Sequence, residues 1–323
     1  MVKKILRNVY YGIKRRRATN KSFRVDLKRL YKYFLAFQNV FLNKDSLRCK
    51  IMLLNHQLEK AQTYSKAKEG YGKDKIVELI RLLQFYKDHY DIDDVYLTSL
   101  GVLQSHIKNP HSHKTDKIIS EAEELINENK NNERGGILLY NSKNIPLIKD
   151  FESFLKSRRS CRKYSQEKIS EKEIKEAVRL AQTSPSACNR QPVRIHYYTD
   201  KEIIKQLIIS QRADIDWCLD ATALIIVTTN SYYFRDYLER HQNMFDAGLF
   251  CMNLNLILHH KGIGSCFKMA QKDPGIENNT KTIGNIPAYE DICVLYCIGK
   301  YPEEPFAVAK SERLDLTNVL TVH

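Results

Sequence analysis

Residues 154–166 have the sequence FLKSRRSCRKYSQ, and this stretch decides what fold the second half of the chain can have. Five basic side chains surround one serine and one cysteine there: Lys156, Arg158, Arg159, Arg162 and Lys163. A phosphate monoester needs fixed positive charge and several hydrogen-bond donors, which arginine guanidinium groups and a hydroxyl supply together. Taken alone, such a stretch is more often a solvated basic helix start.

A second polar stretch, SPSACNRQP at residues 184–192, follows a predicted helix directly. Pro185 ends that helix, and the small residues Ser186 and Ala187 let backbone amides approach a ligand. Asn189 and Gln191 can both donate and accept hydrogen bonds toward the edge of a heterocycle. By itself the stretch could be an ordinary turn, and its position after the basic stretch is what makes a shared site the better interpretation.

Beyond residue 150 the pattern alternates between helices and strands. Ser170 and Glu173 form a capping box before a helix with one apolar face, made by Ile174, Ala177, Val178 and Ala181. The runs RIHYYT, ALIIVTT and ICVLYCIG predict at least three strands, and MFDAGLFCMNLNLILHHKG predicts an apolar helix that ends at Gly262.

The first 130 residues have helical periodicity and no strand pattern. Apolar residues recur at three- and four-residue spacings in KIVELIRLLQFYKDHY, at Ile76, Leu79, Ile80, Leu83 and Tyr86, and in DKIISEAEELINENK, at Ile118, Ala122, Leu125 and Ile126. The polar stretch ENKNNERGG, which ends in two glycines, predicts a boundary. We therefore expect a basic helical module at residues 1–135 and a second domain at residues 136–323.

The charge of the chain is positive and unevenly distributed. The 52 Lys and Arg exceed the 38 Asp and Glu by 14, and residues 1–50 hold fifteen Lys and Arg against Asp26 and Asp45. Such a surface favours anionic partners: a phosphate-bearing cofactor, nucleic acid or an anionic membrane surface. Aromatic residues among the basic ones could touch nucleic acid, but at helical spacing they are more often core, so nucleic acid is the less favoured partner.

The cysteines and the termini indicate a cytoplasmic protein. Seven of the eight cysteines lie beyond residue 160, and none forms a pair or cluster at zinc spacing, so we expect reduced, mostly buried thiols and no metal site. Cys161 and Cys188 are interpreted as packing residues rather than nucleophiles, and His259 and His260 as helix-end residues. We expect no secretory signal and no membrane span.

Residues from about 150 onward resemble the nitroreductase family of FMN-dependent oxidoreductases. Five features occur in the family's order: RRSCRKY, PSACNRQP after a capped helix, KGIGSCFKM, CIGKYP and the late basic KSERL. The resemblance implies an α+β nitroreductase-like fold, a mixed and mostly antiparallel sheet flanked by helices, preceded here by the all-α module. More weakly, the N-terminal helices resemble extensions found on some nitroreductase-like proteins.

The resemblance assigns FMN contacts residue by residue. It implies that Arg158, Ser160 and Arg162 hold the phosphate and ribityl chain, with Arg159 near the isoalloxazine edge. The remaining implied contacts are Lys310 and Arg313 at the same phosphate, Pro185, Ser186, Ala187 and Asn189 along the flavin ring from the partner subunit, and Phe267, Lys268 and Met269 as backbone amides at its N5 and O4 side. No catalytic side chain is implied, because the flavin itself supplies the chemistry.

The implied activity is transfer of two electrons from NADH or NADPH through FMN to a small aromatic or conjugated acceptor, by a homodimer. Two departures from the family pattern leave alternatives open: Val193 stands where relatives often have Trp, and Asp214, just before Trp217, stands where an amide is usual. One alternative is a specialised flavoenzyme of the same fold, a dehalogenase, dehydrogenase or flavin-fragmenting enzyme. The other is a non-catalytic anion-binding scaffold with a lapsed flavin site.

Overall fold

The computed structural model describes residues 2–34, 39–63, 72–108, 116–127, 132–138, 149–212, 215–235, 237–309, 313 and 316–323. The chain divides into two compact units, which we call the helical unit and the sheet unit. The helical unit comprises Met1–Leu147, Pro185–Val193 and Thr229–Leu249, and the sheet unit comprises Ile148–Ser184, Arg194–Thr228 and Phe250–His323. The sequence-based division at residues 135 and 136 stays a prediction.

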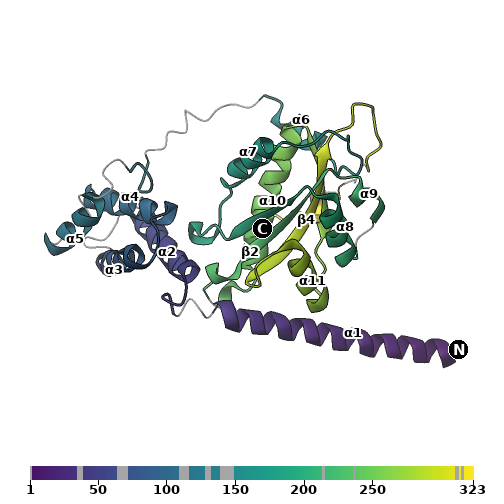
Figure 1. The fold of residues 1–323 in the computed structure, drawn as a ribbon, viewed down its shortest axis with the longest axis horizontal. Coiled ribbons are helices and arrows are strands. Elements are labelled where there is room, and N and C mark those ends of the chain that lie inside the picture. Colours follow the sequence, from purple (N-terminus) through teal and green to yellow (C-terminus); the bar gives the residue numbers. More distant parts are fainter. Residues whose placement is uncertain are drawn as a thin grey trace. The chain divides into compact units, whose positions relative to one another are not determined.

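The N-terminal part of the helical unit consists of helices, as predicted (Figure 1). They are α1 (Val2–Arg29), the π-helical turn η1 (Leu30–Phe34), α2 (Lys44–Gln62), α3 (Lys73–His89), α4 (Asp94–Lys108) and α5 (Asp116–Asn127). Three short 3₁₀ turns from later in the chain belong to the same unit: η4 (Ala187–Asn189), η5 (Ser231–Tyr233) and η6 (Tyr237–Glu239).

One apolar core joins α2, α3, α4 and α5. Each helix turns one stripe inward, because its apolar residues recur every three to four positions. The apolar positions predicted for residues 75–90 and 116–130 are buried in this core, except the partly buried Ile126, and they pack with residues of α2 and α4 such as Leu47, Ile51, Leu58, Val102 and Leu103. None of the described side chains of α1 belongs to this core.

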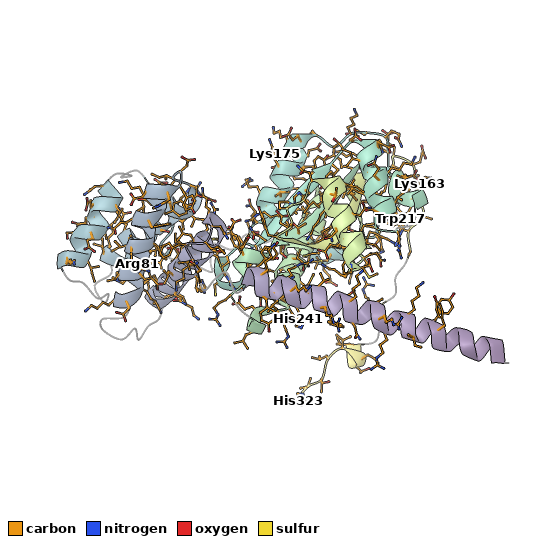
Figure 2. All side chains as sticks on the ribbon, turned by 60° about the horizontal axis from the view of Figure 1, so that its bottom comes forward. Arg81, Lys163, Lys175, Trp217, His241 and His323 are labelled. Atoms are coloured by element: carbon orange, nitrogen blue, oxygen red, sulfur yellow. The ribbon has the colours of Figure 1, made fainter. Side chains whose placement is uncertain are left out.

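The long helix α1 runs directly into η1 and exposes apolar as well as basic side chains (Figure 2). Phe23 is 69% exposed, and Tyr10, Ile13 and Leu27 are also exposed. Among the described residues, no helix has the length and apolar character that crossing a membrane requires.

The sheet has four strands in the spatial order β1, β2, β4, β3. Their bounds are β1 (Val193–Tyr198), β2 (Ala223–Asn230), β3 (Ile263–Met269) and β4 (Glu290–Lys300). β3 and β4 pair antiparallel, with Cys266 opposite Cys297. The Asn230 N–H donates to the Pro192 carbonyl, and the Thr222 N–H donates to the Ile298 carbonyl, so each of these neighbours also runs antiparallel.

Helices cover both faces of this sheet, which gives the α+β class expected from the sequence. The helices of this part of the chain are α6 (Phe151–Ser157), α7 (Glu171–Ala181), α8 (Lys201–Ser210), α9 (Ile215–Leu219), α10 (Gln242–His260), α11 (Pro274–Gly284) and the turn η7 (Leu316–Asn318). Leu295 and Cys297 of β4 pack in one core with Leu207 of α8. Tyr296 points to the other face, where its hydroxyl donates to the Cys251 carbonyl of α10 at 2.7 Å.

The predicted capping box of α7 is present and is tied to the sheet. The Ser170 hydroxyl accepts from the Glu173 N–H, and the Glu173 carboxylate accepts from the Ser170 N–H. Lys300 of β4 also donates to Glu173. Hydrogen bonds from Lys300 and Ser170 lower the pKa of Glu173 to about 2, so the carboxylate stays ionised and the α7 cap stays formed across ordinary pH.

Two glycines let residues 158–164 pack against the edge of the sheet. A Cβ on Gly264 would lie 2.7 Å from the Cys161 Sγ, and a Cβ on Gly299 would lie 2.8 Å from Tyr164. The buried Tyr164 hydroxyl donates to the carbonyl groups of Cys161 and Cys297. We call these two close approaches the glycine lock. They link the glycines of GIG and CIG to Cys161 and Tyr164 of RRSCRKY.

Replacing the lock glycine in Gly264→Ala should lower the free energy of unfolding by about 1–3 kcal/mol, because the added methyl overlaps Cys161 and the chain must shift. Urea unfolding monitored by circular dichroism measures this value. The matched control is Gly248→Ala in α10, where nothing lies within 4 Å of the new Cβ, so helix propensity should add about 0.5–1 kcal/mol. Equal stability of the Gly264→Ala and parent proteins would show that the lock does not exist.

Candidate functional site

The basic stretch follows the outer edge of β3, where it adds a short parallel element to the antiparallel sheet. Ser160 forms an isolated parallel bridge with Ser265, and the Cys161 N–H donates to the Ser265 carbonyl at 2.9 Å. The Ser265 hydroxyl in turn donates to Asn255 of α10 at 2.7 Å, in the interior. These bonds fix the backbone from which the arginines project.

The three arginines of this stretch have no carboxylate partner among the described residues. Arg158 and Arg159 are half-buried and Arg162 is exposed. Arg159 donates to the carbonyl groups of Lys156 and Arg158, so its charge is held close to its own backbone. The neighbouring Lys156 is paired with Glu152 on the exposed side of α6. An anion with several oxygens fits such a donor set, because the stretch brings fixed charge that the described protein groups leave uncompensated.

Two arginines elsewhere in the chain are paired with carboxylates. Arg48 in the helical unit contacts Asp93 and Asp94. Arg190 forms two hydrogen bonds with Glu239, at 2.9 and 3.0 Å. These two arginines join segments of the chain through a carboxylate, whereas no described carboxylate pairs with the arginines of the predicted phosphate cradle.

Arg162 lies over the ring of Trp217 in α9, with 5.4 Å between the guanidinium carbon and the ring centre; Trp217 is labelled in Figure 2. A cation above an indole face is attracted by the ring's negative face. This contact orients Arg162 without neutralising its charge, so the guanidinium stays able to bind an anion.

A histidine on α10, His259, braces the helix end that lies just before Arg158. His259 Nε2 lies 2.7 Å from the Ser157 hydroxyl, its Nδ1 lies 2.9 Å from the Tyr301 hydroxyl, and its ring stacks on Phe154. Burial, together with the charges of Arg158 and His260, lowers the pKa of His259 below its ordinary 6.5. The neutral ring therefore joins α6, α10 and the end of β4 at the base of the basic stretch. Because His259 lies in the last turn of an apolar helix, the sequence pattern gave no signal for this role.

The predicted amide-donating residues lie at the end of β3, which is the edge strand of the sheet. Phe267 is 40% exposed and Met269 is 70% exposed, while Lys268 between them is half-buried. The Phe267 ring packs on Tyr296 of β4 at 4.2 Å. An edge strand presents backbone N–H and C=O groups on its outer side, so these residues fit the role of donors to a polar ring edge.

The thiols in this region are inert. Burial raises the pKa of Cys161 and of Cys266, which keeps both protonated at neutral pH. All eight cysteines are free, and six of them are buried, as the sequence predicted.

The second signature stretch, Pro185 to Gln191, belongs to the helical unit. Its backbone has an uncommon conformation: Cys188, Asn189 and Gln191 have φ angles of 53°, 51° and 52°. Left-handed backbone at residues other than glycine costs about 1–3 kcal/mol each and persists only where the surroundings impose it. The Gln191 N–H donates to the Ser186 hydroxyl at 3.0 Å, which closes the loop on itself.

Asp246 of α10 holds the other side of this loop. Both of its carboxylate oxygens lie 3.3 Å from the Ala187 backbone nitrogen, and Gln242 donates to the same carboxylate at 2.7 Å. Asp246 is 2% exposed, and burial raises the pKa of its carboxyl. The backbone amide of Ala187 therefore has a protein partner.

Of the late basic residues, Arg313 is exposed, and Lys310 lies outside the described residues, as does Asp214. The structure thus brings Arg158, Arg159, Ser160 and Arg162 together with β3. Whether Lys310, Arg313 and the loop at Pro185, Ser186, Ala187 and Asn189 meet the same ligand stays a prediction.

The basic stretch and the residues that follow it match a known protein family. Residues 155–216 match the model of the nitroreductase family. The resemblance expected from the sequence is therefore confirmed, and the match spans the glycine-locked basic stretch, the capped helix α7 and the left-handed loop. No curated protein matches the chain.

Several solved structures are also similar to part of the chain. An FMN-dependent nitroreductase from Clostridium difficile R20291 is 19% identical, with a TM-score of 0.45, and the match covers 54% of this chain and 99% of that one. A nitroreductase-like protein from Streptococcus mutans is 17% identical, with a TM-score of 0.47 and coverages of 55% and 100%. A nitroreductase-like family protein from Bacillus cereus is 18% identical, with a TM-score of 0.45 and coverages of 58% and 99%.

The His259 brace predicts a pH dependence of stability. Because the folded chain disfavours the charged imidazole, the stability contributed by neutral His259 is complete above its ordinary pKa of 6.5 and is lost as the pH falls through the lower folded value. Chemical unfolding at a series of pH values should therefore show less loss between about pH 7.5 and pH 5.5 for His259→Gln than for the parent. Replacing the exposed His241 with Gln is the control and should leave the profile unchanged. Parallel profiles for the parent and His259→Gln would contradict the brace.

Proposed function

We propose that this protein is an FMN-dependent oxidoreductase of the nitroreductase type. The observation that carries the proposal is the group formed by Arg158, Arg159 and Arg162, which is fixed along the edge strand and has no described carboxylate partner. The family match over residues 155–216 supports the same conclusion. A dianionic phosphate would compensate this charge, which is why FMN fits better than a neutral ligand.

The cradle residues would share the phosphate and the chain next to it. Arg158 and Arg162 would bind phosphate oxygens, the Ser160 hydroxyl would donate to the ribityl end, and Arg159 would lie toward the ring. Lys310 and Arg313 would return to the phosphate from the C-terminal segment. Ordinary charged hydrogen bonds contribute about 1.5–3 kcal/mol each, so two arginines are enough to decide whether the cofactor stays bound.

The ring would be held by backbone groups and by a partner subunit. Phe267, Lys268 and Met269 would offer edge-strand amides, and Pro185, Ser186, Ala187 and Asn189 would lie along the ring from the second copy of a homodimer. Bound FMN supplies two-electron chemistry, with NADH or NADPH as donor and a small aromatic or conjugated molecule as acceptor. No general base of this chain is required for that chemistry.

The compartment that fits these features is the cytoplasm, where a nicotinamide donor and reducing conditions occur together. The eight free cysteines support this assignment.

The cradle predicts which variants lose the cofactor. The double change Arg158→Ala and Arg162→Ala should weaken FMN binding by about 100-fold or more, because two charged hydrogen-bonding partners of the phosphate are removed. Fluorescence titration of the flavin-free full-length protein measures the dissociation constant. Arg179→Ala, which removes one exposed arginine on α7, is the control and should bind FMN like the parent. FMN affinity that survives the double change would remove these residues from the assignment.

Absorption spectra and turnover then separate the remaining alternatives. A purified protein without flavin bands that also fails to bind added FMN would be an anion-binding scaffold. A flavin-loaded protein that does not turn over nitroaromatics with NADH or NADPH would be a specialised flavoenzyme of the same fold. Sedimentation of the loaded protein as a monomer would contradict the homodimer.

The helix α1 favours one further partner, an anionic membrane surface. It contains eleven Lys and Arg and one acidic residue, Asp26. The exposed apolar residues Ile13, Phe23 and Leu27 fall on one side of the helix, while Lys14, Lys21 and Lys28 recur every seven residues on another. A basic amphipathic helix of this type lies in the interface of anionic lipid layers. Nucleic acid would use the charge but not the exposed aliphatic side.

Membrane contact predicts lipid-specific cosedimentation of the full chain. Vesicles with phosphatidylglycerol should pull down the protein at low salt, and vesicles of phosphatidylcholine alone should not, since attraction to anionic headgroups is required. The double change Phe23→Ser and Leu27→Ser keeps every charge and should reduce binding about tenfold. Equal binding by this variant would show that only charge is involved, and no binding to either vesicle would end the proposal.

A further inference from the structure

Arg190, between Asn189 and Gln191 of the second signature stretch, is buried inside the helical unit. Its side chain is among the largest that the fold encloses completely, with 1% of the residue exposed. Its Nε donates to the Ala187 carbonyl at 3.0 Å, and its two terminal nitrogens donate to the Glu239 carboxylate of η6. The same guanidinium therefore holds the loop by its backbone and joins it to a second turn.

The helix α2 packs against this loop and against η5. Three residues on one side of α2, spaced as successive helical turns require, face these segments. Asp45 accepts from the Asn230 side chain at 2.9 Å, and Arg48 donates to the Tyr233 hydroxyl at 3.3 Å. Burial raises the pKa of the Cys49 thiol to about 12, and the nearby charge of Arg190 opposes this rise.

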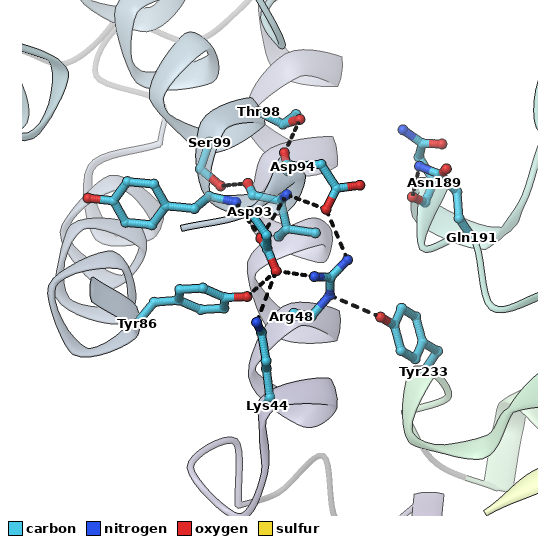
Figure 3. A network of polar contacts seen from close by, with 12 residues as sticks. Lys44, Arg48, Tyr86, Asp93, Asp94, Thr98, Ser99, Asn189, Gln191 and Tyr233 are labelled. Atoms are coloured by element: carbon cyan, nitrogen blue, oxygen red, sulfur yellow. Dashed lines mark hydrogen bonds and ion pairs between the residues drawn. The ribbon is translucent and has the colours of Figure 1, made fainter. Parts of the chain in front are cut away.

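Arg48 and Lys44, one turn apart on α2, also tie this helix to residues next to α3 and α4. Figure 3 shows Arg48 reaching from α2 toward Asp93 and Asp94 on one side and toward Tyr233 on the other. The Tyr86 hydroxyl of α3 donates to the same Asp93 carboxylate, and Lys44 lies 3.4 Å from it. α2 is therefore held in place by other helices of the unit and in turn supports the loop.

We infer that α2, Arg190 and Glu239 form a seat for the flavin-binding loop, so that residues 44–62 are a structural part of the cofactor site. The inference rests on the proposed function and names Arg190 as a positioning residue. Left-handed backbone at Cys188, Asn189 and Gln191 persists only where neighbouring groups impose it. Arg190 does so, because it donates to the Ala187 carbonyl inside the loop and to Glu239 outside it. A chain without this seat would relax the loop before any cofactor arrives.

The test removes the seat's ion pair as a whole, because removing Arg190 alone would leave the Glu239 carboxylate without its partner. In the full-length protein, Arg190→Met and Glu239→Leu are combined, and amide hydrogen exchange of residues 186–191 is measured without flavin. We expect exchange at least tenfold faster than in the parent, with an unchanged far-ultraviolet circular dichroism spectrum. FMN affinity, measured separately by fluorescence titration, should fall at least tenfold.

A control removes another buried ion pair, one that lies within a single helix. Lys281 and Glu277, 3.0 Å apart on α11, are 9% and 5% exposed, and the combined change Lys281→Met and Glu277→Leu should alter neither loop exchange nor FMN affinity. The conservative single change Arg190→Lys keeps the charge but not the paired hydrogen bonds, so its loop exchange should fall between those of the parent and the double variant.

The outcomes separate the seat from the flavin assignment. Parent-like loop exchange in the Arg190→Met and Glu239→Leu protein overturns the seat, and faster loop exchange with parent-like FMN affinity overturns its part in the cofactor site. Failure of the parent itself to bind FMN refutes the proposed function, while the exchange measurement still decides whether α2 and Arg190 hold the loop.

Discussion

The rest of the site depends on how closely residues 158–164 can approach the sheet. Side chains at Gly264 or Gly299 would occupy the space of Cys161 and Tyr164, and the stretch would have to move away from β3. The close packing at the two glycines sets how near Ser160 and the flanking arginines lie to the sheet. The hydrogen bond from the Cys161 N–H to the Ser265 carbonyl then fixes their register along β3. A packing constraint made of small and apolar groups thus determines the position of a charged site.

Electrostatics divides the arginines into two groups with different roles. Arg48 and Arg190 are paired with carboxylates; burial disfavours their charged form, and the pairing outweighs it, so the pKa of each is raised. These two hold segments together. Arg158 and Arg162 have no such partner among the described residues; a neutral histidine contacts Ser157, the residue before Arg158, and Arg162 lies over an indole ring. A neutral group orients a cation but leaves its positive charge uncompensated, so the cation can still bind an anion.

Much of this architecture could be predicted from the sequence, because local rules govern it. Helical periodicity located α3 and α5, the Ser170 and Glu173 pattern gave the cap of α7, and apolar runs gave three of the four strands. β3 was not predicted as a strand, since it follows Gly262, contains Gly264 in its first half and is largely exposed in its second half, Phe267 to Met269. The seat of Arg190 had no local signal either: Cys49 and Glu239 are far from it along the chain, and an arginine in a polar stretch is ordinarily solvated.

The exposed edge of β3 has a consequence for the newly made chain. Phe267 and Met269 are exposed near the end of this edge strand, and an exposed strand edge can pair with a strand of another molecule. Lys268 and the arginines alongside give two approaching copies the same sign of charge at that edge. This like charge therefore disfavours pairing between newly made copies, and its removal should favour aggregation.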